Sequence, residues 1–277
     1  MMGPSSTVLV VGATGSIGNL VVAEAVREGY AVRALVRDPA RAGQLPLETQ
    51  RVVGDLTRPD TLPDVVAGID AIVFTHGTYG SSEAAEGIDY GAVRNVLVAL
   101  GSRQVRIALM TTIGVTSRTS SSRSNNERHE WKRRGERLVR ASGMPYTIVR
   151  PGWFDYNAAD QHRLVLLQGD TRHAGDPSDG VVDRRQIAEV LVRSLASDAA
   201  VRKTFELVAE RGSAPRTAEE FDALFAPLEA DAPGALDAAQ DLPNLPLDQE
   251  PERIRADLRR VRGAAPGAER VSQRRSS

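Results

Sequence analysis

The chain has 277 residues, of which 35 are lysine or arginine and 36 are aspartate or glutamate, so its formal net charge of −1 does not favour nucleic acid or anionic lipid. It contains no cysteine, which excludes disulfides, thiolate metal sites and a cysteine nucleophile. No apolar stretch approaches the roughly 18 residues that a membrane helix needs, and the start MMGPSS lacks the basic region of a secretory signal, so we expect a cytoplasmic protein without a membrane anchor.

Strand-like and helix-like segments alternate through the first 150 residues. The strand candidates are continuous apolar runs, which are typical of a parallel sheet covered on both faces. The helical stretches carry their apolar residues on one side, and a glycine stands near the end of each. Repeated β-α-β units predict an α/β fold with a doubly wound, mostly parallel sheet. The expected strands are Thr7–Val11, Ala31–Val36, Arg51–Val53, Ala71–Phe74, Val105–Met110 and Tyr146–Val149, and the expected helices are Ser16–Glu28, Ile88–Leu100 and Glu127–Ala141.

The rhythm changes after Pro151. Residues Asp155–Asp179 are polar and predict irregular structure, whereas Arg184–Ser197 predicts a helix and Thr204–Val208 a strand. This region is expected to complete the fold on the side where a substrate would bind.

A further change in composition begins at Ser213. Alanine, proline and acidic residues accumulate there, which favours an extension wrapped over the surface, with a short amphipathic helix at Pro251–Val261. We therefore divide the chain into a core at 1–154, a small substrate-side segment at 155–212 and an extended tail at 213–277, whose last residues we expect to be disordered.

The stretch GATGSIG, from Gly12 to Gly18, stands between the first strand and the first helix and fits G-x-x-G-x-x-G. Gly12 would let the chain leave the strand in a conformation barred to residues with a Cβ. Gly15 would let the backbone approach a diphosphate at the positive end of the helix, and Gly18 would let the helix pack closely on the sheet. A plain tight turn is the alternative, but the strand–turn–helix context favours a dinucleotide site. The expected contacts come from Gly12, Thr14, Gly15, Ser16, Ile17 and Gly18.

The end of the second strand indicates which dinucleotide is bound. An acidic residue there bonds the ribose hydroxyls of NAD, whereas an arginine suits the additional phosphate of NADP. Arg37 stands at the tip and Arg41 follows one helical turn later, although Asp38 comes directly after the tip. We therefore expect NADP(H) rather than NAD(H), with a merely solvated charge at Arg37 as the alternative.

Two further strand ends carry residues suited to a dinucleotide. After the third strand, Asp55 can accept a hydrogen bond from the adenine amino group and Leu56 can cover the ring, although Asp55 can equally cap a helix. After the fourth strand, Thr75, His76 and Gly77 are expected beside the ribose and the phosphates. His76 is also a candidate acid or base, but a histidine beside a glycine turn more often only lines a site.

These motifs stand in the order and spacing of a known family. ALVRDPAR and VVGDL follow the glycine loop, IDYGAVRNVLVAL, IALMTTIGV and SGMPYTIVRPG come next, and VVDRRQIAEVLVRSLA and KTFELV close the series. Over residues 7–210 the chain resembles the atypical short-chain dehydrogenase/reductases of the NAD(P)H-binding, NmrA-like type, and the same motifs occur in the flavin and biliverdin reductases of that superfamily. The resemblance implies a Rossmann fold, with the nicotinamide near the carboxyl ends of the fourth to sixth strands. The residues it places there are Thr111, Thr112, Lys132, Pro151, Gly152, Trp153 and Phe154, of which the two aromatic residues can wall a ligand or serve as ordinary packing.

The usual proton donor of this superfamily is missing. Typical short-chain dehydrogenases use Tyr-x-x-x-Lys, in which the tyrosine transfers a proton and the lysine lowers its pKa and holds the nicotinamide ribose. Lys132 stands where the family's lysine belongs, but Arg128 occupies the tyrosine position. Arginine is no general acid near neutral pH, because its pKa is above about 12. The catalytic candidates are Lys132, Thr112 and Tyr79, with His129 and Tyr156 as further substitutes for the tyrosine.

Lys132 also lies in a basic run that includes Arg133, Arg134, Arg137 and Arg140. Such a run is usually a solvated helix face, which is the alternative to a cofactor contact for Lys132. Acidic residues interleave the run and no nucleic-acid-reading motif is visible, so we expect no nucleic-acid partner.

Two functions follow from these patterns. The first is an NADP(H)-dependent oxidoreductase that passes a hydride to a small planar acceptor such as a quinone, a flavin or a conjugated carbonyl. Reduction of a flavin or a quinone needs no tyrosine acid, because the proton can come from water. The alternative, which the NmrA-like resemblance implies, is a non-catalytic NADP(H)-binding sensor or regulator that acts through a protein partner. A homodimer is compatible with both, and no metal site is expected.

Overall fold

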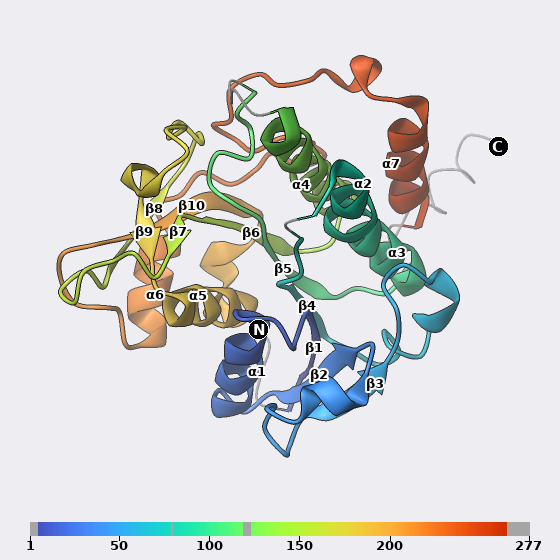
Figure 1. The fold of residues 1–277 in the computed structure, drawn as a ribbon, viewed down its shortest axis with the longest axis horizontal. Coiled ribbons are helices and arrows are strands. Elements are labelled where there is room, and N and C mark those ends of the chain that lie inside the picture. Colours follow the sequence, from blue (N-terminus) through green and yellow to red (C-terminus); the bar gives the residue numbers. More distant parts are fainter. Residues whose placement is uncertain (1–4, 79, 119–122, 265–277) are drawn as a thin grey trace, which may run out of the picture.

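The computed structural model describes residues 5–78, 80–118 and 123–264. The candidate Tyr79 and the final residues, 265–277, for which the sequence predicts disorder, lie outside the described residues. The centre of the molecule is a ten-stranded, mostly parallel sheet with helices on both faces (Figure 1). The doubly wound α/β architecture predicted from the alternating segments is confirmed.

The strands of this sheet match the predicted apolar runs closely. They are β1 (Thr7–Val11), β2 (Ala31–Val36), β3 (Gln50–Val53), β4 (Ala71–Phe74), β5 (Arg106–Met110), β6 (Tyr146–Pro151), β7 (Trp153–Phe154), β8 (Arg163–Leu167), β9 (Val181–Val182) and β10 (Lys203–Glu210). Their order is β3-β2-β1-β4-β5-β6-β10-β9-β7, and β8 pairs with β10 outside this path. From β3 to β10 all neighbours are parallel, whereas β8 and β9 run antiparallel to β10.

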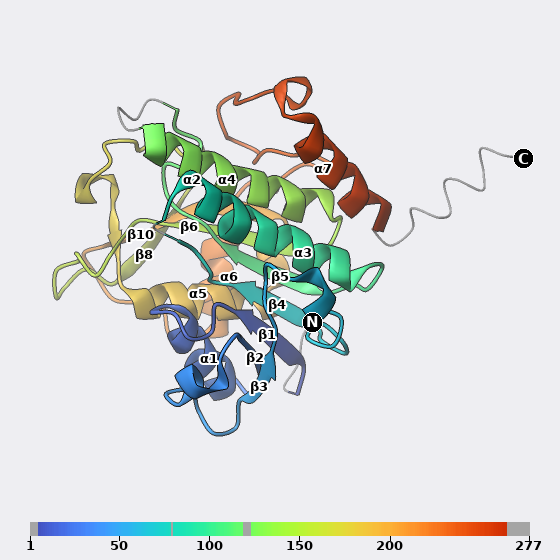
Figure 2. The ribbon, with the colours of Figure 1, turned by 45° about the vertical axis from the view of Figure 1, so that its right-hand side comes forward.

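Seven named α-helices occur in the described part of the chain. They are α1 (Gly18–Arg27), α2 (Ser82–Ala85), α3 (Gly91–Leu100), α4 (Arg123–Ala141), α5 (Arg184–Ala196), α6 (Ala218–Phe225) and α7 (Glu252–Ala264). A π-helix at Glu86–Tyr90 joins α2 to α3, so the helix predicted from Ile88 has a wider first turn than expected. Helices α1 and α5 cover one face of the sheet, and α3 and α4 cover the other (Figures 1 and 2).

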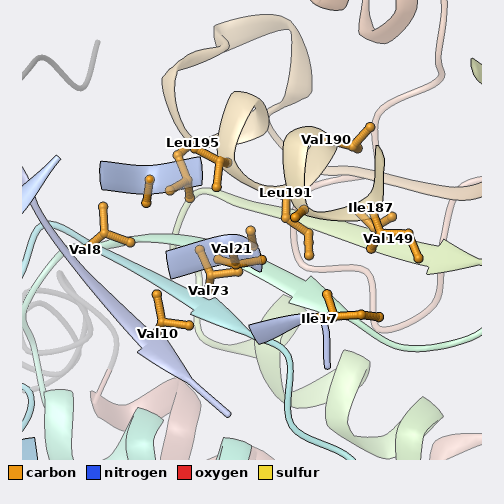
Figure 3. Packing of buried hydrophobic residues seen from close by; sticks show 14 of the residues in the cluster. Val8, Val10, Ile17, Val21, Val73, Val149, Ile187, Val190, Leu191 and Leu195 are labelled. Atoms are coloured by element: carbon orange, nitrogen blue, oxygen red, sulfur yellow. The ribbon is translucent and has the colours of Figure 1, made fainter. Parts of the chain in front are cut away.

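Each face of the sheet has its own apolar core. On the α1 and α5 face, Val21 and Leu191 point toward Val10 and Val73 of the central strands (Figure 3). All four side chains are fully buried, and burying one such side chain contributes about 1.5–3 kcal/mol. The opposite core joins α3, α4 and α7 to the same strands.

Two elements lie where the sequence analysis expects neither a strand nor a helix. Strand β8 falls inside the polar segment 155–179, because its short apolar run pairs antiparallel with β10, a partner about 40 residues away in the chain. Helix α6 falls inside the alanine- and proline-rich tail. Its start is fixed by a reciprocal capping box between Thr217 and Glu220, and Phe221 and Phe225 bury its apolar side. The prediction of irregular structure was therefore wrong at β8, and helix α6 is an addition to the predicted extension.

The segment that joins α6 to α7, residues 226–251, is called the C-terminal strap below. It runs along the outer side of α4 before α7 packs beside α3 and α4 (Figures 1 and 2). Ile254, Leu258 and Val261 of α7 are buried in that core. The wrapped extension expected from composition therefore has a well-defined course over the lysine-bearing helix.

The basic run of α4 is not a solvated face, and that reading of the sequence was wrong. Its arginines are buried because carboxylates of the strap and of α4 itself cover them. The pairs are Arg133, Arg134 and Arg137 with Glu250, Arg137 with Asp237, and Arg140 with Asp231 and Glu136.

Candidate functional site

The candidate site lies at the carboxyl ends of β1, β4, β5 and β6. The order of the strands reverses between β1 and β4, and open α/β sheets bind ligands at such a switch point. The loop after β1 touches the loop after β4, and the loop after β5 is hydrogen-bonded to the end of β6. The structure thus brings together most of the segments that the sequence singles out.

The three glycines of the first loop have different surroundings. Gly12 has φ +86°, and a Cβ there would lie 2.8 Å from the backbone nitrogen of His76. At Gly18 a Cβ would lie 2.0 Å from the Gly12 carbonyl oxygen and 2.8 Å from Oγ1 of Thr75. A Cβ on Gly15 would meet only the Gly12 oxygen, at 3.1 Å. Packing inside the protein therefore requires glycine at 12 and 18, whereas Gly15 is exposed and faces outward.

The first turn of α1 presents free amides beside Gly15. The helix has no acidic residue in its first turn and no side-chain cap at Ile17. Within the described residues, the amides of Ser16, Ile17 and Gly18 donate no hydrogen bond. Unpaired amides at the positive end of a helix dipole suit an anion such as a diphosphate.

The ends of β2 and β3 lie next to each other at the edge of this site. Arg37 is exposed, and its charge helps to lower the pKa of Asp55. The larger causes of that shift are hydrogen bonds from the amide and hydroxyl of Thr57, at 2.8 and 2.7 Å. Asp55 thus closes a turn with Thr57 and does not cap a helix, because the next helical segment, Pro59–Thr61, begins after Arg58. Leu56 is half-buried against the core, and its carbonyl accepts a hydrogen bond from the Asn95 amide.

The residues after β4 line the site with neutral groups. The Thr75 hydroxyl donates to the carbonyl of Val11 at 3.0 Å, so it ties β4 to β1. His76 is buried, and burial together with the nearby Lys132 charge lowers its pKa to about 3. Its ring packs edge-on against Phe74. His76 is therefore neutral at physiological pH and is no cationic acid.

Lys132 is paired with a residue that the sequence analysis missed. Its Nζ donates to Oδ1 of Asp89 at 2.9 Å, and Asp89 is buried in the π-helix Glu86–Tyr90. Burial raises the pKa of Asp89, and the Lys132 charge opposes this. A Cβ on Gly77 would lie 3.4 Å from both charged atoms, so the glycine backbone lies directly beside the pair. Asp89 stands in the motif IDYG. An acidic residue in this otherwise mostly apolar motif is the feature of the sequence that could have indicated a partner for a lysine.

The end of β5 is held from two sides. The hydroxyl of Thr111 donates to Glu136 of α4 at 2.7 Å, and the amide of Ile113 donates to the carbonyl of Pro151 at 3.0 Å. Thr112 lies between them, half-buried, with its hydroxyl 3.3 Å from the Ile113 carbonyl. Thr111 is therefore a structural contact to α4, and Thr112 is the more accessible of the two threonines.

The loop after β5 is anchored by a fully buried carboxylate. Asp170 accepts hydrogen bonds from the amides of Gly114 and Thr116, at 2.6 and 2.7 Å. His129 lies against Gly114, and burial lowers its pKa, so its ring is neutral as well. The Nδ1 atom of His129 is buried and has no partner among the described residues, which makes His129 a poor substitute for the missing tyrosine.

Strand β6 is followed by β7, a strand of two residues that pairs with β9. A Cβ on Gly152 would lie 2.4 Å from the carbonyl oxygen of Gly180, so this glycine is required by packing. Trp153 and Phe154 form β7 and are half-buried. The ring of Tyr156 packs edge-on against Trp153 and is 64% exposed, so Tyr156 stands at the rim of this aromatic group. The side chain of Arg41, the second arginine near the tip of β2, is not among those that the structure describes.

Residues 12–198, from the glycine loop through α5, match the profile of the NAD(P)H-binding family. The chain belongs to the NAD(P)H-binding family. The resemblance drawn from the motifs is thereby confirmed, and with it the Rossmann type of the fold.

Proteins named for different roles are similar to this chain in sequence. The chain is 27% identical over 210 residues to the photosystem II assembly factor Ycf39 of Trieres chinensis, covering 74% of this chain and 65% of that one. It is 24% identical to sanguinarine reductase of Eschscholzia californica, covering 79% and 94%. It is 30% identical to an NAD(P)H azoreductase of Xenophilus azovorans, covering 68% and 63%. The chain thus spans somewhat less than two thirds of the assembly factor and of the azoreductase.

Solved structures show the same fold. An oxidoreductase from Lactococcus lactis superposes with a TM-score of 0.62 at 16% identity, covering 78% of this chain and 95% of that one.

Among the residues that the structure describes, no helix is both long and apolar enough to span a bilayer.

Proposed function

We propose that this protein is an NADPH-dependent reductase that transfers hydride to a small planar acceptor. The observation that carries the proposal is the pairing of Gly15, which faces open space, with the unpaired amides of Ser16, Ile17 and Gly18. A diphosphate at this end of the helix would offer acceptors to these donors. The residues present therefore fit a dinucleotide.

Other residues of the site have roles that match this cofactor. Arg37 would bind the additional phosphate of NADP, since it is exposed at the tip of β2. Lys132 would hold the nicotinamide-side ribose, because Asp89 engages only one of the three hydrogens that its ammonium group can donate. When bound, NADPH supplies the hydride. The rings of Trp153 and Tyr156 offer an apolar surface on which a flat acceptor can lie.

The nature of the acceptor follows from the missing acid. Arg128 stands where a tyrosine would be, and the two histidines of the site, His76 and His129, have lowered pKa values and are neutral. An acceptor that takes its proton from water, such as a quinone, a flavin or a conjugated carbonyl, needs none of them. The similarity to a sanguinarine reductase and to an azoreductase supports a reductase that acts on planar conjugated molecules.

A second function has its own support. The arginine at position 128 and the similarity to an assembly factor favour a non-catalytic NADP(H)-binding regulator that acts through a protein partner. Such a protein would use the same glycine loop and would bind NADPH without turning it over.

One experiment distinguishes the two functions. Calorimetry would measure binding of NADPH and NADH to the purified protein, and absorbance at 340 nm would follow NADPH loss with a panel of quinones, flavins and enones. Binding with turnover supports the reductase, and binding without turnover across the panel supports the regulator. Absence of binding to either nucleotide would refute both.

A further inference from the structure

The C-terminal strap places carboxylates deep inside the protein. Asp231 and Glu250 are 0% and 2% exposed, and the side chain of Asp241 is 4% exposed. A buried charge is tolerated only when an opposite charge and hydrogen bonds compensate it. Each of these carboxylates meets at least one arginine. The strap is therefore part of the interior and not a loose appendage.

Asp241 is linked by side chains to the loop after β5. It binds Arg150 of β6 with both oxygens, at 2.7 and 2.8 Å. The other edge of Arg150 binds both oxygens of Glu136, at 3.0 and 2.7 Å. Glu136 in turn accepts the hydrogen bond from Thr111. Arg150 and Glu136 are both fully buried, so water does not screen these contacts.

Arg150 and Glu136 are both close in the sequence to residues that are assigned to the cofactor. Arg150 directly precedes the segment from Pro151 to Phe154, and Glu136 lies one helical turn after Lys132 on α4. A shift of the Arg150 guanidinium would therefore be felt at the end of β6, on the lysine-bearing helix and at Thr111.

The strap also reaches the same loop directly. The side-chain amide of Asn244 donates to the carbonyl of Thr116 at 3.0 Å. Thr116 is the residue whose amide and hydroxyl bind Asp170. Both ends of the loop 111–116 are thus connected to the strap, one end through Arg150 and Glu136 and the other through Asn244.

We propose that Asp241 is a positioning residue for the cofactor site, and that the strap sets the geometry of the loop 111–116 and of the end of β6 through Arg150. The effect on NADPH binding rests on the proposed function. The contacts from Asp241 through Arg150 and Glu136 to Thr111 do not depend on it. Because the strap lies beyond the residues shared with the family profile, the positioning belongs to this chain's own tail.

Asp237 offers a matched control on the same strap. It also binds an arginine with both oxygens, Arg137 at 2.7 Å for each contact. Its side chain is 40% exposed, and within the described part of the chain the Arg137 guanidinium bonds only to groups of the strap, which are Asp237, Glu250 and the carbonyl of Leu245. Loss of the Asp237 charge therefore removes a similar ion pair without disturbing β5 or β6.

The test compares Asp241→Asn with Asp237→Asn in the full chain, at a temperature well below the melting midpoint of both. Hydrogen exchange of the peptide 111–117 is measured without ligand, and calorimetry gives the Kd for NADPH. We expect at least fivefold faster exchange and at least fivefold weaker NADPH binding for Asp241→Asn, and changes within twofold for Asp237→Asn. Asn244→Ala, which removes only the direct contact to Thr116, should speed exchange of the same peptide and serves in place of Asp241→Asn if that variant does not fold.

The outcomes are distinct. Exchange and binding as in the wild type, in a folded Asp241→Asn protein of lower melting temperature, would show that the strap only stabilises the fold and would overturn the proposal. Equal effects of Asp241→Asn and Asp237→Asn would do the same. If the wild-type protein binds no NADPH, the proposed function fails, and the exchange comparison still decides whether the strap positions the loop.

Discussion

Substitutions at the glycines of the first loop can separate effects on stability from effects on NADPH binding. Gly15→Ala adds a methyl group whose only close neighbour is the Gly12 carbonyl oxygen, at 3.1 Å, and Gly15 has no positive φ to lose. A glycine-to-alanine change at a compatible position stabilises by about 0.4–1 kcal/mol through the unfolded state, which offsets the tight contact. We expect the free energy of unfolding to change by less than about 1 kcal/mol.

Gly18→Ala is the contrasting perturbation. Its methyl group would lie 2.0 Å from a backbone oxygen and 2.8 Å from the Thr75 hydroxyl, so the helix must move away from the sheet. Overpacking of this kind costs about 1–3 kcal/mol, occasionally more. We expect a loss of about 3 kcal/mol, which lowers the melting temperature by roughly 6 °C or more in a chain of this size.

Gly15→Ala should weaken binding although it leaves stability nearly unchanged. In Gly15→Ala the methyl group occupies the place through which a diphosphate would approach the amides, so we expect at least a tenfold rise in the Kd for NADPH, which is about 1.4 kcal/mol. The assays are thermal unfolding followed by circular dichroism and calorimetric titration with NADPH. A folded Gly15→Ala protein that binds NADPH as tightly as the wild type would refute the placement of the diphosphate.

The other predictions concern single charges. Arg37→Ala should raise the Kd for NADPH at least tenfold and leave that for NADH within twofold, whereas the exposed control Arg58→Ala should change neither; equal losses for both nucleotides would contradict the phosphate assignment. Lys132→Ala should lower turnover or NADPH affinity at least tenfold in steady-state assays, and unchanged kinetics would remove Lys132 from the site. Burial, with the nearby Asp170 charge, raises the pKa of Glu206 from 4.5 to about 8, while Arg150 opposes the shift. Between these values the native state holds a proton that the unfolded state has lost, so this contribution to stability falls as pH rises from 4.5 to 8, by about 1.4 kcal/mol per pH unit. In urea unfolding across pH 5–8, Glu206→Gln should lack this fall, and curves that stay parallel to the wild type would show that Glu206 does not titrate there.

Local sequence determined the Rossmann core. A short apolar run such as Thr7–Val11 favours a strand covered on both faces, and GATGSIG after it indicates a tight passage into a helix. The predicted bounds of β1, β2 and β4 agree with the structure residue for residue. These features depend on neighbours within a few positions, which is why they could be predicted.

What the sequence could not decide is which groups lie opposite one another. The arginines of α4 have the pattern of a solvated face, and they are buried only because Asp237, Glu250 and their neighbours, about 100 residues later, fold back over them. Asp89 meets Lys132 across 43 positions, and β8 becomes a strand only because β10 supplies its hydrogen bonds. The cost of burying a charge or a backbone group depends on the partner that reaches it through space. Local patterns therefore fixed the strands and the glycine loop, while the tertiary structure alone decided which charges are buried and how the tail is tied to the site.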